Sequence, residues 1–473
     1  MDMAKLNPSH PGSFKTRAVF AAVVVLGILS AGIYWINFKI YERFPIFADL
    51  KQIEFYVIVF MVLSALYLVA VFLAIKMRPG NKNTWRMTGI IIFLAIIFRL
   101  CLIAPQPAVL SSDIYRYIWD GRVQQNGINP YLYPPAAAEL ENLRDDRIFP
   151  HINRKDDPTL YPAGAQVFFR IFYMLVGDSV TGYKSIMVFF DLLTLAVLIA
   201  LLQTCRLNRA RIIVYAWNPL VVFEIAYSGH LEGLVVFLMV AALYLYLMCK
   251  KIPAIIMLAV SAAVKLYPAL LLAAFLNRAD RVKGIIAFAA TLILLYLPFV
   301  AAGGKITGFL PVYLKNPYES FNLGLKTFVM RVIPSLDYAW LSLLFLVVLA
   351  TAGLIVFLKE KKDFDVLRYA YILTGLLLIL MPAALHPWYV VLITPFLVIY
   401  PCPAWLLFSC SVTLSYLKYT SPQGMMPDWV LWAEYLPLFV SLSAGFILSK
   451  YSRREKVISL DLTEKNKKIA GVP

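Results

Sequence analysis

The chain has 473 residues, of which 61% are hydrophobic and 15% are charged, and its mean hydropathy is +0.75. Ordinary soluble domains contain roughly 45–50% apolar and about 25% charged residues, so this composition excludes them. The net charge of +17 does not indicate nucleic-acid binding, because the basic residues cluster in short segments between apolar stretches, as they do in the cytoplasmic loops of membrane proteins.

Apolar stretches follow one another along the chain, with lengths typical of helices that cross a hydrocarbon core about 30 Å thick. They are residues 18–38, 55–75, 85–102, 183–202, 231–249, 284–302, 339–358, 369–384 and 429–448. Together with shorter apolar segments, they predict an all-α polytopic membrane domain over residues 1–449, with about 11–13 transmembrane helices. A basic tail over residues 450–473 follows this domain.

The basic clusters lie in every second loop, and this alternation predicts the orientation of the chain in the membrane. Both termini are expected on the cytoplasmic side, and two long loops, residues 104–162 and 303–336, on the outside. The outer loops are rich in polar and aromatic residues, whereas the cytoplasmic loops are short. We therefore expect any chemistry to face away from the cytoplasm.

Two segments are too short or too broken to cross a membrane simply. Residues 252–276 have basic clusters on both sides, so this segment is expected to enter the membrane and return, as a hairpin with Lys265 at its apex. A lysine at that depth needs an anionic partner, which is either a substrate phosphate or an acid of the chain itself. Residues 168–175 are expected to form a helix at the membrane interface.

The densest polar segment is residues 111–135, SSDIYRYIWDGRVQQNGINPYLYPP. Helical spacing of i, i+3, i+4 and i+7 puts four of its side chains on one face. They are Asp113, Arg116, Tyr117 and Asp120. Ser112 is the expected N-cap of this helix and Gly127 its expected end. The helix is either an interfacial one with a surface ion pair or one wall of an active site, and the density of polar and aromatic groups favours the active site.

The outer loops and broken helices supply further candidates for substrate binding. They are Asn129, Tyr131, Asn153, Tyr161, Asn218, Glu224, His230, Glu232, His386 and Trp388. Candidate cations for a phosphate group are Lys265, Arg116 and Arg122. Structural alternatives remain open, because asparagines cap loops, a buried histidine is often simply satisfied and aromatic residues anchor helices at the lipid interface. No metal-ligand spacing or cofactor motif occurs, although Asp113 with Asp120 could hold a divalent ion.

Five motifs in order resemble a known family: SSDIYRYIWDGRVQQNGINPY, HIN, PTLYPAGAQ, YAWNPLVVFEIAYSGHLEG and VKLYP. They are similar to the bacterial polyprenyl-phosphate-mannose-dependent mannosyltransferases, the glycosyltransferase family 87 type of the GT-C superfamily. The similarity extends from about residue 98 to residue 272. It implies a GT-C fold in the bacterial inner membrane, a lipid-phosphate sugar donor and an extracytoplasmic active site. It also implies a catalytic aspartate, at Asp113 or, as the second choice, Asp120.

The sequence and the resemblance together predict a membrane glycosyltransferase of cell-envelope glycan biosynthesis. The enzyme is expected to move a hexose, most simply mannose, from a polyprenyl-phosphate sugar to a lipid-linked glycan or glycolipid, with inversion and an aspartate as general base. The alternative is a flippase, polymerase or transporter of lipid-linked oligosaccharides. A third hypothesis, a membrane scaffold, does not account for the polar segment 111–135. Neither alternative needs one irreplaceable carboxylate.

Overall fold

The structure is a computed structural model that describes residues 11–43, 50–76, 82–103, 110–315, 321–381, 384–421 and 424–451. It is 78% helical, and the described residues contain no strand, which confirms the predicted all-α fold. Within those residues, 6 helices are long and apolar enough to cross a membrane, and several shorter apolar helices accompany them. The structure is therefore that of a polytopic membrane protein, while the total of about 11–13 transmembrane helices stays a prediction.

Every predicted apolar stretch coincides with a helix in the structure, although the stretch 369–384 extends beyond the end of its helix at Ile379 and includes residues 382–383, which lie outside the described residues. The long helices are α1 (Pro11–Arg43), α2 (Leu50–Ile75), α3 (Lys82–Ile103), α6 (Val180–Thr204), α12 (Arg281–Tyr296) continued by η6 (Leu297–Thr307), α15 (Tyr338–Leu358) and α20 (Asp428–Tyr451). The helices of intermediate length are α4 (Asp113–Gln125), α5 (Ala163–Val176), α9 (Glu232–Leu247), α10 (Lys251–Val264), α14 (Leu325–Val332), α16 (Asp365–Ile379) and α19 (Pro403–Ser411).

Short helical segments join these helices and mark the points where the chain breaks or turns. They are η1 (Ala138–Leu143), η2 (Phe149–His151), η3 (Arg209–Ile212), α7 (Ile213–Ala216), α8 (Pro219–Val222), η4 (Phe223–Tyr227), η5 (Tyr267–Leu271), α11 (Leu272–Phe275), α13 (Leu310–Lys315), α17 (Pro387–Val390), η7 (Val391–Ile393), α18 (Thr394–Leu397) and η8 (Val412–Thr420).

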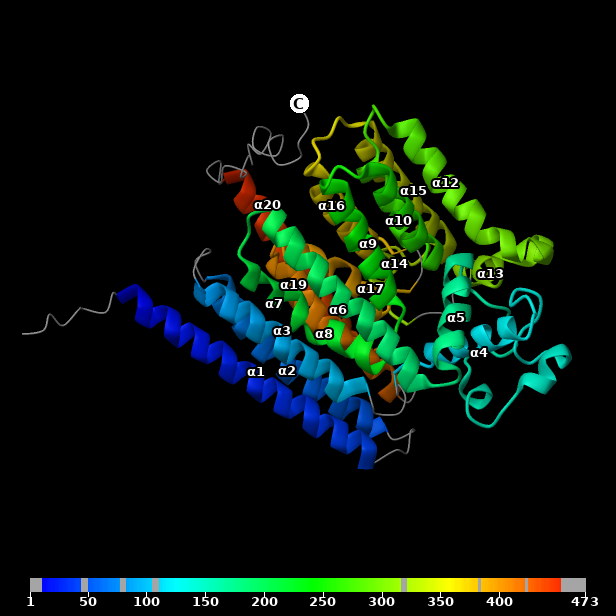
Figure 1. The fold of residues 1–473 in the computed structure, drawn as a ribbon, viewed down its shortest axis with the longest axis horizontal. Helices are drawn as coiled ribbons and strands as arrows, with labels where there is room; N and C mark the ends of the chain where they lie inside the picture. The colour runs from blue at the N-terminus through cyan, green and yellow to red at the C-terminus, as the bar shows by residue number, and fades with distance from the viewer. Residues whose placement is uncertain are drawn as a thin grey trace, which may run out of the picture.

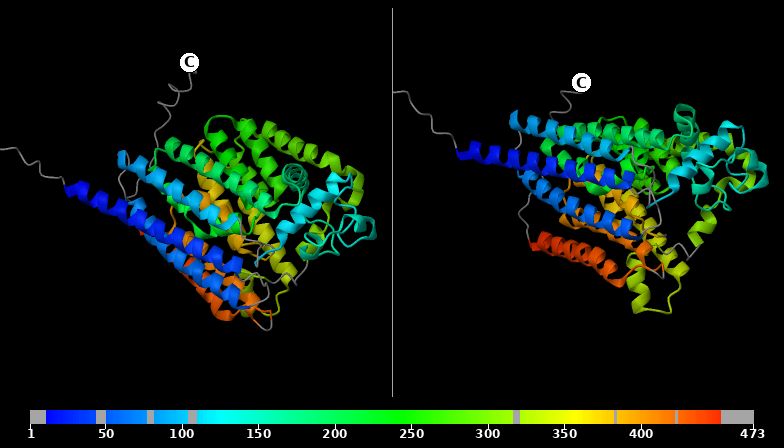
Figure 2. Two further views of the ribbon diagram at one scale, coloured as in Figure 1. Left: turned by 60° about the horizontal axis from the view of Figure 1, so that its bottom comes forward. Right: turned by 90° about the horizontal axis from the view of Figure 1, so that it is seen from below.

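The long helices form a bundle with a polar region at one end. In Figure 1, α1, α2, α3 and α6 run side by side, and α12 lies along the opposite edge. The helices α4 and α5, with the turns around them, project beyond one end of the bundle in all three views (Figures 1 and 2). The predicted polar loop thus forms a separate region at that end. Its residues 104–109 lie outside the described part of the chain, as do residues 316–320 of the second long loop and residues 452–473 of the basic tail.

The predicted hairpin is confirmed. Helix α10 ends at Val264, and Lys265 has extended backbone, with φ −143° and ψ 136°. The chain then returns through η5 and α11. The contact between its two ends shows this, since the Lys251 ammonium lies 3.5 Å from the carboxylate of Asp280. Asn277 likewise donates a 3.1 Å hydrogen bond to the hydroxyl of Tyr246. Both ends of the segment therefore meet, and Lys265 lies at its far end.

Basic clusters gather where the hairpin starts and ends. Lys251 also lies 3.6 Å from Asp363, and Arg278 forms a 2.8 Å ion pair with Glu360. The clusters at residues 250–251, 278–283 and 359–362, which are far apart in sequence, thus share one end of the bundle. The helices α9 and α10 meet at this basic end, and their opposite ends carry Glu232 and Lys265. The polar region around Lys265 therefore lies at the other end of the bundle. This separation is what the positive-inside pattern predicts for loops on opposite sides of a membrane.

A broken helix crosses the centre of the bundle at Asn218-Pro219, as the sequence predicts. Proline has no backbone N–H, so it starts a helix readily and cannot continue one. The Asn218 side chain accepts a 3.0 Å hydrogen bond from the backbone of Leu220 and donates to Tyr67 and Ser409. These bonds satisfy Asn218 within the core. Asn218 is not among the residues that line the cavity described below, so its contacts in the structure are structural ones.

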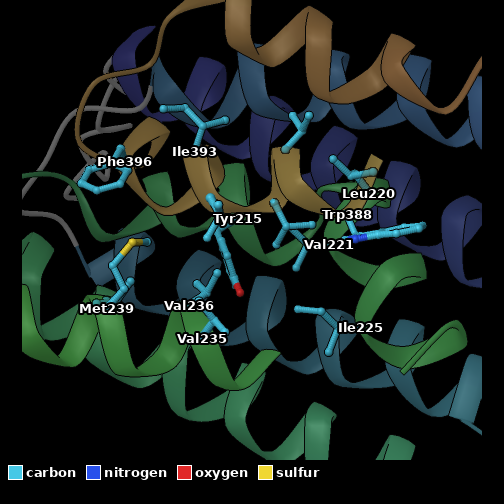
Figure 3. Close-up of a cluster of buried hydrophobic side chains, with 14 of the residues drawn as sticks. Tyr215, Leu220, Val221, Ile225, Val235, Val236, Met239, Trp388, Ile393 and Phe396 are labelled. Carbon is cyan, nitrogen blue, oxygen red and sulfur yellow. The ribbon is translucent and has the colours of Figure 1, made fainter. Parts of the chain in front are cut away.

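The short segments around this break build the tightest part of the core. Figure 3 shows side chains of α7, α8 and η4 packed against α9 and against α17–α18. They include Tyr215, Leu220, Val221, Ile225, Val235, Val236, Met239, Trp388, Ile393 and Phe396. All but Trp388 are at most 1% exposed. Packing of this density holds the broken backbone in place, so the residues at its ends have fixed positions.

A buried ion pair joins α3 to α6. Arg99 donates from Nε to Asp191, and both side chains are fully buried. Arg99 also donates to the carbonyl oxygens of Ala95 and Ala216, at 3.0 and 2.9 Å. Asp191 accepts a 2.7 Å hydrogen bond from the Tyr215 hydroxyl. Hydrogen bonds from several elements compensate the desolvation of the two charges, so loss of either partner would leave the other buried and unpaired.

We predict that Arg99→Ala and Asp191→Ala each lower the free energy of unfolding by about 3–5 kcal/mol. The matched control is Arg278→Ala, whose ion pair with Glu360 is solvated, with side chains 68% and 75% exposed. Removal of such a pair costs under about 1 kcal/mol. Unfolding of the detergent-solubilised variants in denaturant measures both effects. Equal losses in the two pairs would contradict the structural role of Arg99 and Asp191.

Candidate active site

One cavity of about 840 Å³ opens where the polar region meets the hairpin. Its polar and aromatic lining residues, which we call the charged wall, are Ser111, Ser112, Asp113, Arg116, Asn153, Arg154, Tyr161, Lys265, Tyr267, His386, Trp388, Tyr389 and Tyr419. Its apolar lining residues, which we call the apolar wall, are Leu110, Leu160, Leu266, Leu270, Phe309, Leu310, Leu346, Leu349, Ala350, Leu377 and Met381. Parts of the chain more than 250 residues apart thus form a single site that is lined by both charged and hydrocarbon side chains.

Asp113 is the first residue of α4 and the carboxylate that lines the cavity. Its Oδ1 accepts a 2.9 Å hydrogen bond from the amide of Asn153, which fixes the orientation of the carboxylate. Ser112 occupies the N-cap position as predicted, but its side chain makes no capping bond; the Asp113 N–H instead donates to the Ser111 hydroxyl. Asp113 is thus a partly exposed carboxylate held by one neighbour.

Asp120 lies on the same helix but does not reach the cavity. It is 2% exposed and its Oδ1 accepts a 2.9 Å hydrogen bond from Nε of Arg116. Its Oδ2 accepts from Gln166 at 2.8 Å. Both oxygens are therefore occupied, so the second-choice assignment of Asp120 as the base does not fit the geometry. Arg116, by contrast, lines the cavity, and its NH1 also donates to the carbonyl oxygen of Asp157 at 3.1 Å.

Arg122 belongs to a different network, which corrects its expected role at a phosphate. Its guanidinium pairs with Asp145 at 2.6 Å and with Asp178 at 2.7 Å, and donates to the carbonyl of Leu143. Partial burial raises the pKa of Asp145, but hydrogen bonds from Arg122 and from two backbone N–H groups outweigh burial and hold this pKa at about 2. Arg122 therefore ties the long loop to α4 and to the start of α6, away from the cavity.

Lys265 reaches the cavity from the apex of the hairpin. Its ammonium lies 2.5 Å from Oε1 of Glu232, and the same oxygen accepts a 2.8 Å hydrogen bond from the Tyr267 hydroxyl. Glu232 is fully buried behind them and does not line the cavity. Its expected contact with substrate is thus replaced by a supporting role, in which it neutralises and orients Lys265.

An aromatic stack forms part of the charged wall. His230, Trp388, His386 and Phe321 follow one another with ring-centre distances of 4.2, 4.3 and 4.6 Å. His386 and Trp388 line the cavity, as predicted. Because histidine rings cover both faces of Trp388, a ligand can contact only its edge. The predicted binding residue Trp388 therefore cannot act as a flat platform for a sugar ring.

The inner end of this stack is closed to the cavity. His230 is buried, with Nε2 3.3 Å from a carboxylate oxygen of Glu224. The other oxygen of Glu224 accepts a 2.8 Å hydrogen bond from the hydroxyl of Tyr416. Neither His230 nor Glu224 lines the cavity, so these two predicted binding residues support the stack from behind.

The remaining predicted residues divide between lining and support. Tyr161 and Asn153 line the cavity. Tyr117 is buried against Phe169, with ring centres 4.9 Å apart. Asn129 and Tyr131 hold the loop through hydrogen bonds to backbone carbonyl groups. Asn129 donates to the carbonyl of Phe299 at 3.2 Å, and the Tyr131 hydroxyl donates to that of Tyr161 at 2.8 Å.

The second long loop closes the cavity through a close backbone approach. The N–H of Phe309 donates a 3.0 Å hydrogen bond to the carbonyl of Thr159. Gly308, at φ +53°, permits this contact, because a Cβ there would lie 1.8 Å from the same oxygen. Phe309 and Leu310 consequently become cavity residues.

Part of the cavity lining was not predicted from the sequence. Tyr267 lies in the motif that contains Lys265, and Tyr389 directly follows Trp388, so their proximity to predicted residues indicated that they belong to the site. Arg154 stands beside Asn153 in the same way. The leucines of the apolar wall carry no such signal, because leucines that face a cavity and leucines that face lipid look alike in the sequence.

The described residues do not form the cluster of ligand side chains that a metal site needs. Among the described residues, no three histidine, cysteine, aspartate or glutamate side chains come together. The less favoured pairing of Asp113 with Asp120 around an ion also conflicts with the contacts of Asp120, which pairs with Arg116 and Gln166.

Comparison with known proteins identifies a family for this chain. No curated protein and no solved structure matches the chain significantly. Residues 17–279, more than half of the chain, match the family described as alpha-(1->6)-mannopyranosyltransferase, N-terminal domain. This range includes α4, the long polar loop and the hairpin with Lys265, so it contains most of the charged wall. The chain belongs to the MptA_B family of alpha-(1->6)-mannopyranosyltransferases.

Proposed function

We propose that this protein transfers mannose from a polyprenyl-phosphate mannose to a hydroxyl of a glycolipid or lipid-linked glycan, on the extracytoplasmic face of the membrane. One observation carries the proposal: a carboxylate, two positioned cations and a hydrocarbon wall line the same cavity. A sugar joined to a lipid by a phosphate needs all three kinds of contact. The family supplies the sugar, since its members are named for mannose transfer.

Asp113 is the general base in this proposal. It is the carboxylate that lines the cavity, and Asn153 holds one of its oxygens at 2.9 Å. A base must lie within hydrogen-bonding reach of the hydroxyl that it deprotonates, and its orientation matters as much as its basicity. Asn153 is then a positioning residue, because it orients Asp113 without taking up the proton.

The transfer is a single displacement. The acceptor hydroxyl gives its proton to Asp113, its oxygen forms a bond to the anomeric carbon, and the bond from that carbon to the phosphate oxygen breaks. Polyprenyl phosphate leaves with the electron pair. A single displacement inverts the anomeric carbon, as in inverting glycoside chemistry. An alpha-linked product therefore requires a beta-linked donor.

Arg116 and Lys265 stabilise the departing phosphate. Each cation has its own carboxylate, Asp120 for Arg116 and Glu232 for Lys265, so the two pairs add little net charge to the cavity. This balance suits a phosphodiester donor with a single negative charge better than a diphosphate. Extra negative charge develops as the leaving group departs, and preorganised donors act on charge that develops in the transition state. The side chains supply this positive charge, so the proposal includes no metal ion or other cofactor.

The apolar wall holds the first isoprene units of the donor. Leu270 of η5, Leu346, Leu349 and Ala350 of α15 and Leu377 of α16 bury hydrocarbon that would otherwise meet water. The orientation of the protein in the membrane is proposed from the basic clusters at one end of the bundle. If residues 250–251, 278–283 and 359–362 face the cytoplasm, the cavity opens on the opposite side.

We predict that Asp113→Asn lowers kcat roughly 10²- to 10⁴-fold, the usual contribution of a general base, and leaves the unfolding temperature unchanged. Release of polyprenyl phosphate from polyprenyl-phosphate mannose, by protein reconstituted in liposomes, measures the rate. The comparison variant is Asp120→Asn, which breaks a buried ion pair and is expected to lower the unfolding temperature as well. Wild-type kcat in Asp113→Asn would rule out Asp113 as the base, whereas a wild-type protein that releases no polyprenyl phosphate would favour the flippase or transporter alternative.

A second prediction concerns stereochemistry. The beta-linked polyprenyl-phosphate mannose is expected to be consumed and to give an alpha-mannoside, whereas the alpha-linked donor is expected to be inert. Nuclear magnetic resonance of the anomeric carbon in the product distinguishes the two configurations. A beta-mannoside formed from the beta-linked donor would show net retention and would refute the single displacement.

A further inference from the structure

Arg154 has a backbone conformation that arginine rarely adopts. Its φ is +49°, in the left-handed region where a side chain meets the following carbonyl group. Only two other non-glycine residues in the described part of the chain share this feature, Arg206 and Cys249. The three cases are not equivalent.

Helix capping accounts for Arg206 and Cys249. Each follows the C-cap of a helix, α6 or α9, and each takes part in the paired hydrogen bonds of a Schellman motif. At Arg206 the bonds run from its own N–H to Gln203 and from Leu207 to Leu202, at 3.0 and 2.8 Å. The left-handed residue is the normal way to end such a helix, so these two positions need no functional explanation.

Capping does not account for Arg154. It follows no α-helix, and it is the first residue of a turn in which Asp157 donates its N–H to the Arg154 carbonyl at 3.1 Å. The conformation of the first residue is not set by a turn of this kind. Sparsely populated backbone conformations that surrounding structure maintains cluster at functional sites.

The position of Arg154 shows what its conformation achieves. Its side chain lines the cavity, and the preceding residue, Asn153, holds Asp113. Its carbonyl accepts a 3.4 Å hydrogen bond from NH1 of Arg116. Arg154 therefore lies between the carboxylate and one of the two cations assigned to the phosphate.

The Arg154 guanidinium contacts Asp157 and Phe309. Its ion pair with Asp157 is 3.5 Å long, with side chains 29% and 33% exposed, so it is weaker than the pair between Arg116 and Asp120. The guanidinium carbon lies 5.1 Å from the ring centre of Phe309, on the second long loop. Arginine carries a planar cation that binds phosphate oxygens in pairs.

We propose that Arg154 binds the phosphate of the lipid-linked sugar donor, and that its left-handed backbone is maintained because it directs this side chain into the cavity. The inference rests on the proposed function and adds to it a third cation that lines the cavity. Arg154 is then a donor-binding residue whose contact strengthens as the leaving phosphate gains charge.

The substitution Arg154→Gly distinguishes a role of Arg154 in donor binding from a role in maintaining the fold. Arg154→Gly removes the guanidinium and keeps the carbonyl that Arg116 needs, in a residue that tolerates positive φ. We expect it to unfold at the wild-type temperature or above, while KM for the donor rises roughly ten- to a hundredfold, the usual effect of losing a charge-assisted hydrogen bond. KM for the acceptor stays unchanged, and Arg154→Lys gives an intermediate KM for the donor. The matched control is Arg206→Gly, which relieves the same backbone conformation far from the cavity and leaves both KM values unchanged.

Binding of the leaving group provides a readout besides activity. Polyprenyl phosphate is expected to raise the unfolding temperature of the wild type and of Arg206→Gly more than the uncharged polyprenol does, and Arg154→Gly is expected to lose most of this difference. If Arg154→Gly keeps the full difference, or if only its acceptor KM rises, the inference is wrong and the proposed function stands. If the wild type itself does not distinguish polyprenyl phosphate from polyprenol, the proposed donor is wrong, and the inference with it.

Discussion

Buried ionisable side chains inside this bundle are held by partners from the chain itself, and this constraint organises the rest of the structure. Arg99 with Asp191 and Lys265 with Glu232 are ion pairs among apolar helices, where an unpaired charge is costly, and His230 lies beside Glu224 in the same way. Each pair joins separate elements of the fold. The pairs therefore fix how broken helices and long helices meet, in addition to neutralising charge.

The same pairing explains why the cavity can hold cations without becoming strongly positive. Lys265 and Arg116 reach the cavity with their carboxylates behind them, so they are oriented before a ligand arrives. Arg154 differs, because its ion pair with Asp157 is longer and partly solvated. The charged wall thus combines three cations with a carboxylate held by Asn153. The helices α15 and α16 contribute hydrocarbon to the same cavity, which suits a ligand with a charged centre and a lipid tail.

Much of this fold could be predicted from the sequence, because long apolar stretches, basic clusters and prolines act locally. Helix positions, the hairpin around Lys265 and the break at Asn218-Pro219 are of this kind. The placement of Asp113, Arg116 and Lys265 near one another also followed from motif spacing and topology. Long-range partners could not be predicted: Arg122 pairs with acids 23 and 56 residues away, and Trp388 is covered by His230. Such contacts depend on packing between helices, and the spacing of residues along the sequence does not indicate which helices pack together.

The central claim is that the donor lies between the charged wall and the apolar wall of this cavity. Photo-crosslinking tests it most directly, with a polyprenyl phosphate that carries a diazirine on the isoprene unit next to the phosphate. In reconstituted wild-type protein, the account predicts crosslinks in residues 266–270, 346–350 and 377–381, competed by polyprenyl-phosphate mannose. Crosslinks confined to lipid-exposed faces of α1 or α12, or crosslinks that the donor does not compete, would contradict it.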